Sequence, residues 1–138
     1  MSIIFIQAMT QAQKDQIREH FEEKGVECMA DYPVSPEDIE DLRATKNPAG
    51  ANAPCFIACM FKKVGVMSED GMLVGDNAIE LAKKVFDDAE ELESVKNYLH
   101  SCASVNTETV SDGAKGCERA LLAYKCMMAN AEKFGFQI

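Results

Sequence analysis

The chain has no tryptophan, only two histidines, and fewer basic than acidic side chains, 14 against 23. The formal net charge of −9 repels phosphate backbones and anionic membrane surfaces, so we expect no nucleic-acid partner. No apolar run approaches the roughly 20 residues that a membrane-spanning helix needs, so we also expect no stable membrane insertion. A chain of 138 residues is long enough for one domain with its own core.

Signatures of catalysis and of metal binding are also missing. There is no nucleophile elbow and no phosphate-binding loop, and we expect His20 and His100 on solvated helix faces rather than as a catalytic pair. Zinc would favour Cys-x-x-Cys pairs or histidines at short spacing. A calcium loop starting at Asp70 would put apolar side chains at three ligand positions. The sequence therefore predicts no enzyme, no metal site and no cofactor.

The N-terminus resembles the apolar part of a secretion signal, but it is too short to act as one. We assign residues 1–9 to a leader remnant or an added extension. Residues 10–138 are then predicted to form a single domain.

Helical spacing and capping residues recur along that domain. Thr10 and Gln13 form a capping box, Ser35 precedes a first-turn proline, and glycines at 25, 65 and 135 are placed to end helices. No alternating pattern predicts a strand, so the predicted fold class is all-α. The expected helical segments are about 10–25, 36–42, 54–64, 76–86, 88–102 and 114–134.

Six cysteines lie within or beside these expected helices, at positions 28, 55, 59, 102, 117 and 126. Cys55 and Cys59 are four positions apart, so both leave about the same helix face and each needs a distant partner. Cys117 and Cys126 lie about 180° apart around the last helix, whose apolar residues also surround it. Disulfides in an oxidising, extracellular setting are expected, with reduced buried thiols as the alternative; 15 connectivities remain open.

The spacing of these cysteines resembles that of the insect odorant-binding protein family, including its pheromone-binding branch. Three residues separate the second cysteine from the third and eight separate the fifth from the sixth, while the intervals from Cys59 to Cys102 and from Cys102 to Cys117 lie at the long end of the family's pattern. The resemblance covers the chain from about residue 10 to its end. It implies about six helices around an internal apolar cavity, stapled by the disulfides Cys28–Cys59, Cys55–Cys117 and Cys102–Cys126.

An internal cavity gives a physical reason for three disulfides. An unfilled space of several hundred Å³ loses packing at about 24 cal/mol per Å³, and each disulfide contributes about 2–4 kcal/mol. The eight methionines suit an adaptable apolar lining, although each one alone is equally at home in an ordinary core.

The resemblance also implies which residues line the cavity. Tyr124 is the lining residue with a hydroxyl, which would orient an alcohol, aldehyde or ester; a core tyrosine bonded to backbone is the alternative. The implied lining is Phe21, Ile57, Phe61, Val66, Met67, Leu73, Leu81, Leu99, Ala103, Tyr124 and Met127.

The short tail after Cys126 leaves no room for the additional helix of long-tailed moth pheromone carriers. Phe134 and Phe136 flank Gly135, so the chain can fold back there and lay aromatic side chains over a cavity mouth. We expect both phenylalanines to contact a ligand as parts of a lid.

These features predict a secreted, extracellular carrier that binds small hydrophobic molecules such as odorants or pheromones and transports them through aqueous fluid. The resemblance suggests a chemosensory receptor as a second partner, and a monomer or homodimer as the assembly. The alternative is a secreted helical structural or signalling protein without a small-molecule ligand.

The disulfide scheme predicts that the protein has no free thiol. Maleimide labelling of the denatured, unreduced protein is expected to give no adduct in intact-mass spectrometry. Two or more labelled cysteines would contradict the scheme.

Overall fold

Six α-helices and two short 3₁₀-helices make up the computed structural model, which describes residues 9–135. The all-α prediction is confirmed, and the extended pairing in this range is one isolated antiparallel bridge between Met67 and Leu73. The elements are α1 (Gln11–Cys28), α2 (Pro36–Arg43), α3 (Ala53–Val64), α4 (Asp76–Ala82), α5 (Ala89–His100), η2 (Ala103–Thr107), η3 (Gly113–Lys115) and α6 (Cys117–Phe134).

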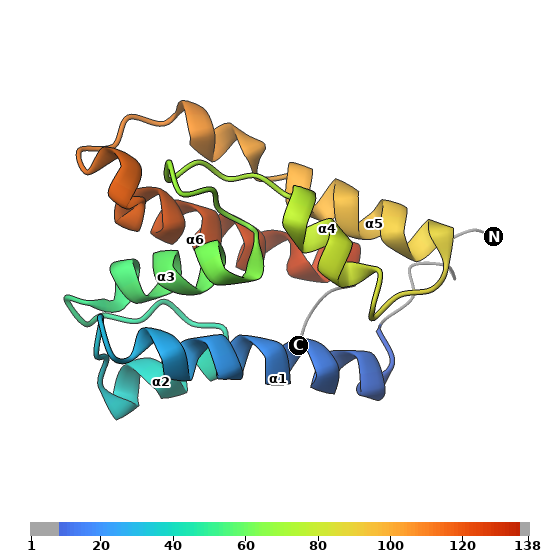
Figure 1. Ribbon diagram of the computed structural model, residues 1–138, viewed down its shortest axis with the longest axis horizontal. Helices are drawn as coiled ribbons and strands as arrows, with labels where there is room; N and C mark the ends of the chain where they lie inside the picture. The colour runs from blue at the N-terminus through green and yellow to red at the C-terminus, as the bar shows by residue number, and fades with distance from the viewer. Residues whose placement is uncertain (1–8, 136–138) are drawn as a thin grey trace.

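The helices are stacked in three levels (Figure 1). α3 and α6 pack against each other in the middle. α1 lies along one side against α3, with α2 beside it, and α4 and α5 lie on the opposite side, where α5 packs against α6. The central pair therefore contacts helices on both of its sides.

Several helix ends follow from local capping chemistry, as predicted. The Thr10 hydroxyl accepts from the Gln13 amide at 3.1 Å, while the Gln13 side chain accepts from the Thr10 amide at 2.9 Å. Ser35 caps α2 by accepting from the Asp38 amide. Gly65 ends α3 in the left-handed conformation, where an added Cβ would lie 2.4 Å from Asn77, so both backbone and packing require glycine.

Four predicted boundaries are wrong, and one of them is the end of α4, which lies at Ala82 rather than at residue 86. α1 continues past Gly25 to Cys28, because the buried Gly25 packs on Phe56 and Met60 of α3, and this packing overrides the preference of glycine for helix ends. Asp76 is the first residue of α4 rather than its cap, and its side chain makes no capping bond. The last helix begins at residue 117 rather than 114, because the left-handed Gly116 separates it from η3.

α6 is buried over most of its circumference, which agrees with its apolar pattern. Its exposed side chains fall on one stripe, formed by Glu118, Lys125, Ala129, Glu132 and Lys133. Its remaining faces pack on α3, α5 and η2, so α6 is the central helix of the fold.

All six cysteines are oxidised in the pairing that the resemblance implies. α3 carries two of these bonds, one to α1 and one to α6, and the third joins the end of α5 to α6. The bonds are Cys28–Cys59, Cys55–Cys117 and Cys102–Cys126.

The C-terminal end of η2 is held by a buried arginine, Arg119, in the first turn of α6. Its Nε donates to the Val105 carbonyl at 3.0 Å, and its Nη2 donates to the carbonyls of Glu108 at 3.0 Å and Asn106 at 3.4 Å. One planar guanidinium thus satisfies three backbone acceptors, which a lysine ammonium could not do from one place.

We expect Arg119→Met to lower the free energy of unfolding by about 3 kcal/mol, because it removes charge-assisted bonds to buried carbonyls. Arg43→Met is the matched control: Arg43 makes an exposed ion pair with Glu22, so its loss is expected to cost less than about 1 kcal/mol. Urea unfolding with the disulfides intact measures both changes. Equal effects of the two substitutions would contradict the role assigned to Arg119.

Candidate functional site: an apolar cavity between the helices

A cavity of about 730 Å³ lies among the helices. All six α-helices contribute to its lining. Its deepest part is formed by α3 and α6, where Ile57, Phe61, Tyr124 and Met127 are buried. A space of this size and lining matches the sites that proteins use for small apolar ligands.

The structure brings eight of the sequence-predicted lining residues together around this cavity. They come from α1, α3, α4, α5, α6 and the segment after α3, which are far apart in the sequence. The eight are Phe21, Ile57, Phe61, Val66, Leu81, Leu99, Tyr124 and Met127.

Four further predicted residues lie elsewhere. Met67 is buried with its sulfur against Gly116, where an added Cβ would lie 2.9 Å away. Leu73 and the exposed Ala103 line a separate space of about 200 Å³. The ring of Phe134 lies 5.6 Å from that of Tyr98, outside the main cavity. Phe136 lies outside the described residues, and so does the rest of the predicted lid.

Sequence reasoning missed several residues that line the cavity. Phe56, Met60 and Val64 extend the contribution of α3, and their spacing of four was available as a signal. Tyr98 lies one turn before Cys102, which placed it on the inward face of α5. Met9, inside the segment predicted as an extension, is also buried against the cavity.

The two tyrosines of the cavity both use their hydroxyl protons on backbone carbonyls. Tyr98 Oη donates to the Met127 carbonyl at 2.8 Å, and Tyr124 Oη donates to the Lys46 carbonyl at 2.9 Å. Burial raises the pKa of Tyr98 from 10.0 to about 12. Burial, with a smaller effect of the Asp41 charge, raises the pKa of Tyr124 to about 12. Both phenols therefore stay neutral, and the hydroxyl of Tyr124 is bonded to backbone as in the core alternative.

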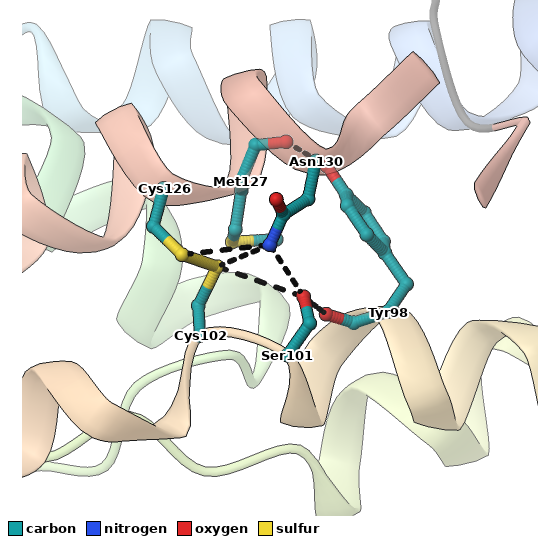
Figure 2. Close-up of a disulfide and its surroundings, with 6 residues drawn as sticks. All are labelled: Tyr98, Ser101, Cys102, Cys126, Met127 and Asn130. Atoms are coloured by element: carbon teal, nitrogen blue, oxygen red, sulfur yellow. Dashed lines mark hydrogen bonds between the residues drawn. A yellow bond between two sulfur atoms is a disulfide. The ribbon is translucent and has the colours of Figure 1, made fainter. Parts of the chain in front are cut away.

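A polar cluster fixes Tyr98 where α5 meets α6 (Figure 2). The Asn130 amide points at the Cys102–Cys126 disulfide and donates to Ser101 Oγ at 2.9 Å, and Ser101 Oγ donates to the Tyr98 carbonyl at 2.6 Å. The Asn130 nitrogen also lies 3.6 and 3.7 Å from the two sulfur atoms. The disulfide and these hydrogen bonds thus hold the end of α5 against α6, next to the cavity.

The cavity reaches the surface between charged side chains. Arg18, Glu22, Arg43 and Lys84 are exposed residues that belong to its lining. Arg43 Nε lies 3.4 Å from Glu22 Oε2, so this ion pair joins α2 to α1 at the rim. An apolar molecule in the cavity thus lies behind a solvated, charged mouth.

The loop between α2 and α3 borders the same mouth, and polar contacts attach it to both α2 and α6. The buried carboxylate of Asp38 accepts from the Gly50 amide at 3.0 Å, and the Lys46 carbonyl accepts from Tyr124. Thr45, which lines the cavity, has a positive φ of 57°. Contacts to both α2 and α6 thus hold this part of the rim.

Residues 9–135 contain neither a membrane-spanning helix nor a cluster of metal-ligating side chains. No helix in this range is both long and apolar enough to cross a membrane. The same residues contain no group of three or more histidine, cysteine, aspartate or glutamate side chains able to hold a metal ion.

The raised tyrosine pKa values predict a dependence of stability on alkaline pH. The fold favours the neutral phenols, so their contribution is complete below the unfolded pKa of 10.0 and is lost as the pH rises towards about 12. Spectrophotometric titration of tyrosinate is expected to show two late-ionising phenols, one of which disappears in each of Tyr98→Phe and Tyr124→Phe. Ionisation of both at the ordinary tyrosine pKa would contradict their burial.

Known proteins resemble this chain over most of its length. Residues 10–130 match the sequence profile of the PBP/GOBP family. General odorant-binding protein 19d of Drosophila melanogaster is 30% identical over 122 residues, which cover 88% of this chain and 78% of that protein. General odorant-binding protein 28a of the same organism is 28% identical over 115 residues, 82% of this chain and 76% of that protein.

A solved structure has the same fold. Odorant-binding protein dmelOBP28a from Drosophila melanogaster superposes with a TM-score of 0.68 at 22% identity, covering 90% of this chain and 99% of that one. The resemblance seen in the cysteine spacing is thereby confirmed. On the profile match and the 30% identity to a relative, the chain belongs to the PBP/GOBP family of odorant-binding proteins.

Proposed function

We propose that the protein is a secreted carrier that binds one small hydrophobic molecule, such as an odorant or pheromone, and transports it through aqueous fluid. The observation that carries the proposal is the cavity of about 730 Å³ with its apolar lining. Transfer of apolar surface from water into such a cavity is favourable by about 25 cal/mol per Å², so desolvation supplies most of the affinity.

Three further features support a carrier. The relatives are named as odorant-binding proteins, and members of that family are carriers rather than enzymes. Three disulfides suit an oxidising extracellular fluid. The net charge of −9 favours solubility of a protein that moves freely in that fluid. A chemosensory receptor would be the recipient of the ligand, and the assembly would be a monomer or homodimer.

The direct test is titration of the purified, delipidated protein with an apolar fluorophore whose emission rises on transfer out of water. Saturable binding of one molecule per chain, reversed by long-chain alcohols or esters, is expected. A folded protein that takes up no fluorophore would contradict the proposal and favour a structural or signalling role.

The substitution Phe61→Ala tests whether that binding takes place in the cavity. Removal of the buried ring enlarges the space, so preference is expected to shift towards bulkier ligands, at a cost of about 3–5 kcal/mol in stability. Leu73→Ala is the matched control, because Leu73 is buried but lies outside this cavity. An unchanged ligand ranking in folded Phe61→Ala would place the binding elsewhere.

A further inference from the structure

One side chain of the cavity lining has a polar atom without a partner. His20 lies in the middle of α1, next to Phe21 and one turn after Ile17, and all three line the cavity. The Nε2 atom of His20 is buried and makes no hydrogen bond. A buried polar atom without a partner costs free energy, and in a native structure such an atom needs an explanation.

The other buried polar groups nearby do not share this property. The hydroxyl groups of Tyr98 and Tyr124 both donate to backbone carbonyls. Asp112 Oδ1 is likewise buried without a partner, but Asp112 precedes η3 and is not part of this cavity. Gln16 and Thr45 are exposed at the rim. Among the described residues that line the cavity, His20 thus has the one buried side-chain nitrogen or oxygen left without a partner.

The chemistry of imidazole defines what would satisfy this atom. The Nε2 of a neutral histidine accepts a hydrogen bond in one tautomer and donates one in the other, so it can pair with a hydroxyl or with a carbonyl oxygen. Protein atoms cover Nε2, so the ring must turn to meet a ligand. Rotation about the Cβ–Cγ bond is easy because this torsion has a broad energy profile.

We propose that His20 is the polar anchor of the cavity and selects ligands with a long apolar chain and one hydroxyl or carbonyl oxygen. This inference rests on the proposed carrier function and names the ligand class of the same cavity. The apolar chain fills the cavity among the helices, and the single oxygen pairs with Nε2. A ligand with several polar groups is disfavoured, because its other groups would be buried without partners.

The experiment compares three probes of equal chain length, decane, 1-decanol and decanal, by displacement of the fluorophore. The measured quantity is the affinity for each oxygenated probe divided by the affinity for decane. This ratio is expected to fall about tenfold for at least one oxygenated probe in His20→Phe and in His20→Leu, because the hydrogen bond is lost while apolar contact remains. His20→Gln, which restores a polar group, is expected to recover most of the ratio.

Two further variants make the result specific. His100→Phe removes the other histidine, which is exposed and outside the main cavity, and is expected to keep the ratio of the original protein. Tyr124→Phe tests the rival anchor. A ratio that falls in Tyr124→Phe but not in the two apolar His20 variants would overturn the inference and assign the anchor to Tyr124.

The remaining outcomes separate this inference from the proposed function. Binding of all three probes with a ratio unchanged in folded His20→Phe and His20→Leu overturns the role of His20 and leaves the carrier function standing. Failure of the original protein to bind any probe overturns both.

Discussion

The covalent connection of four helices around an unfilled space is the constraint on which the rest of the structure depends. Cys28–Cys59 joins α1 to α3, Cys55–Cys117 joins α3 to α6, and Cys102–Cys126 joins the end of α5 to α6. A chain that leaves about 730 Å³ unfilled forgoes part of the packing that usually stabilises a domain of this size. Cross-links restrict the unfolded chain and so offset part of that loss.

Polar groups then determine how apolar the space remains. The hydroxyl groups of Tyr98 and Tyr124 donate to backbone carbonyls, and the Arg119 guanidinium donates to carbonyls at the C-terminal end of η2. The side-chain amide of Asn130 lies against a disulfide. Each of these groups is satisfied within the protein, so the interior presents mostly hydrocarbon to a guest. Among the described residues of the cavity lining, the unpaired Nε2 of His20 is the exception, which is why it carries an inference about the guest.

The general architecture could be predicted from the sequence because it rests on local signals and on cysteine spacing. The Thr10–Gln13 capping box and the glycine at 65 determine helix ends through contacts within a few residues. The extent of α1 past Gly25 could not be predicted in this way, since it depends on packing against Phe56 and Met60 of α3, which are distant from Gly25 in the sequence.

The lining residues show the same division. Positions close to a cysteine on a regular helix, such as Ile57, Phe61 and Tyr124, line the cavity as the family resemblance implied. The segment between α3 and α4 is irregular and contains the isolated bridge between Met67 and Leu73. Met67 packs against Gly116, and Leu73 lines the separate smaller space, so neither side chain lines the main cavity. We expected His20 on a solvated helix face, because no pattern distinguishes it from a solvated residue; the burial of its Nε2 atom depends on tertiary packing around α1.

The central claim is that the stapled helices enclose a space that an apolar guest occupies. A crystal structure of the protein soaked with a bromine-labelled long-chain alcohol tests it most directly, because the anomalous signal of bromine locates the guest. The account predicts one principal bromine peak inside the cavity, within contact distance of Phe61 or Met127. Bromine peaks confined to the outer surface, with the cavity empty or collapsed, would contradict it.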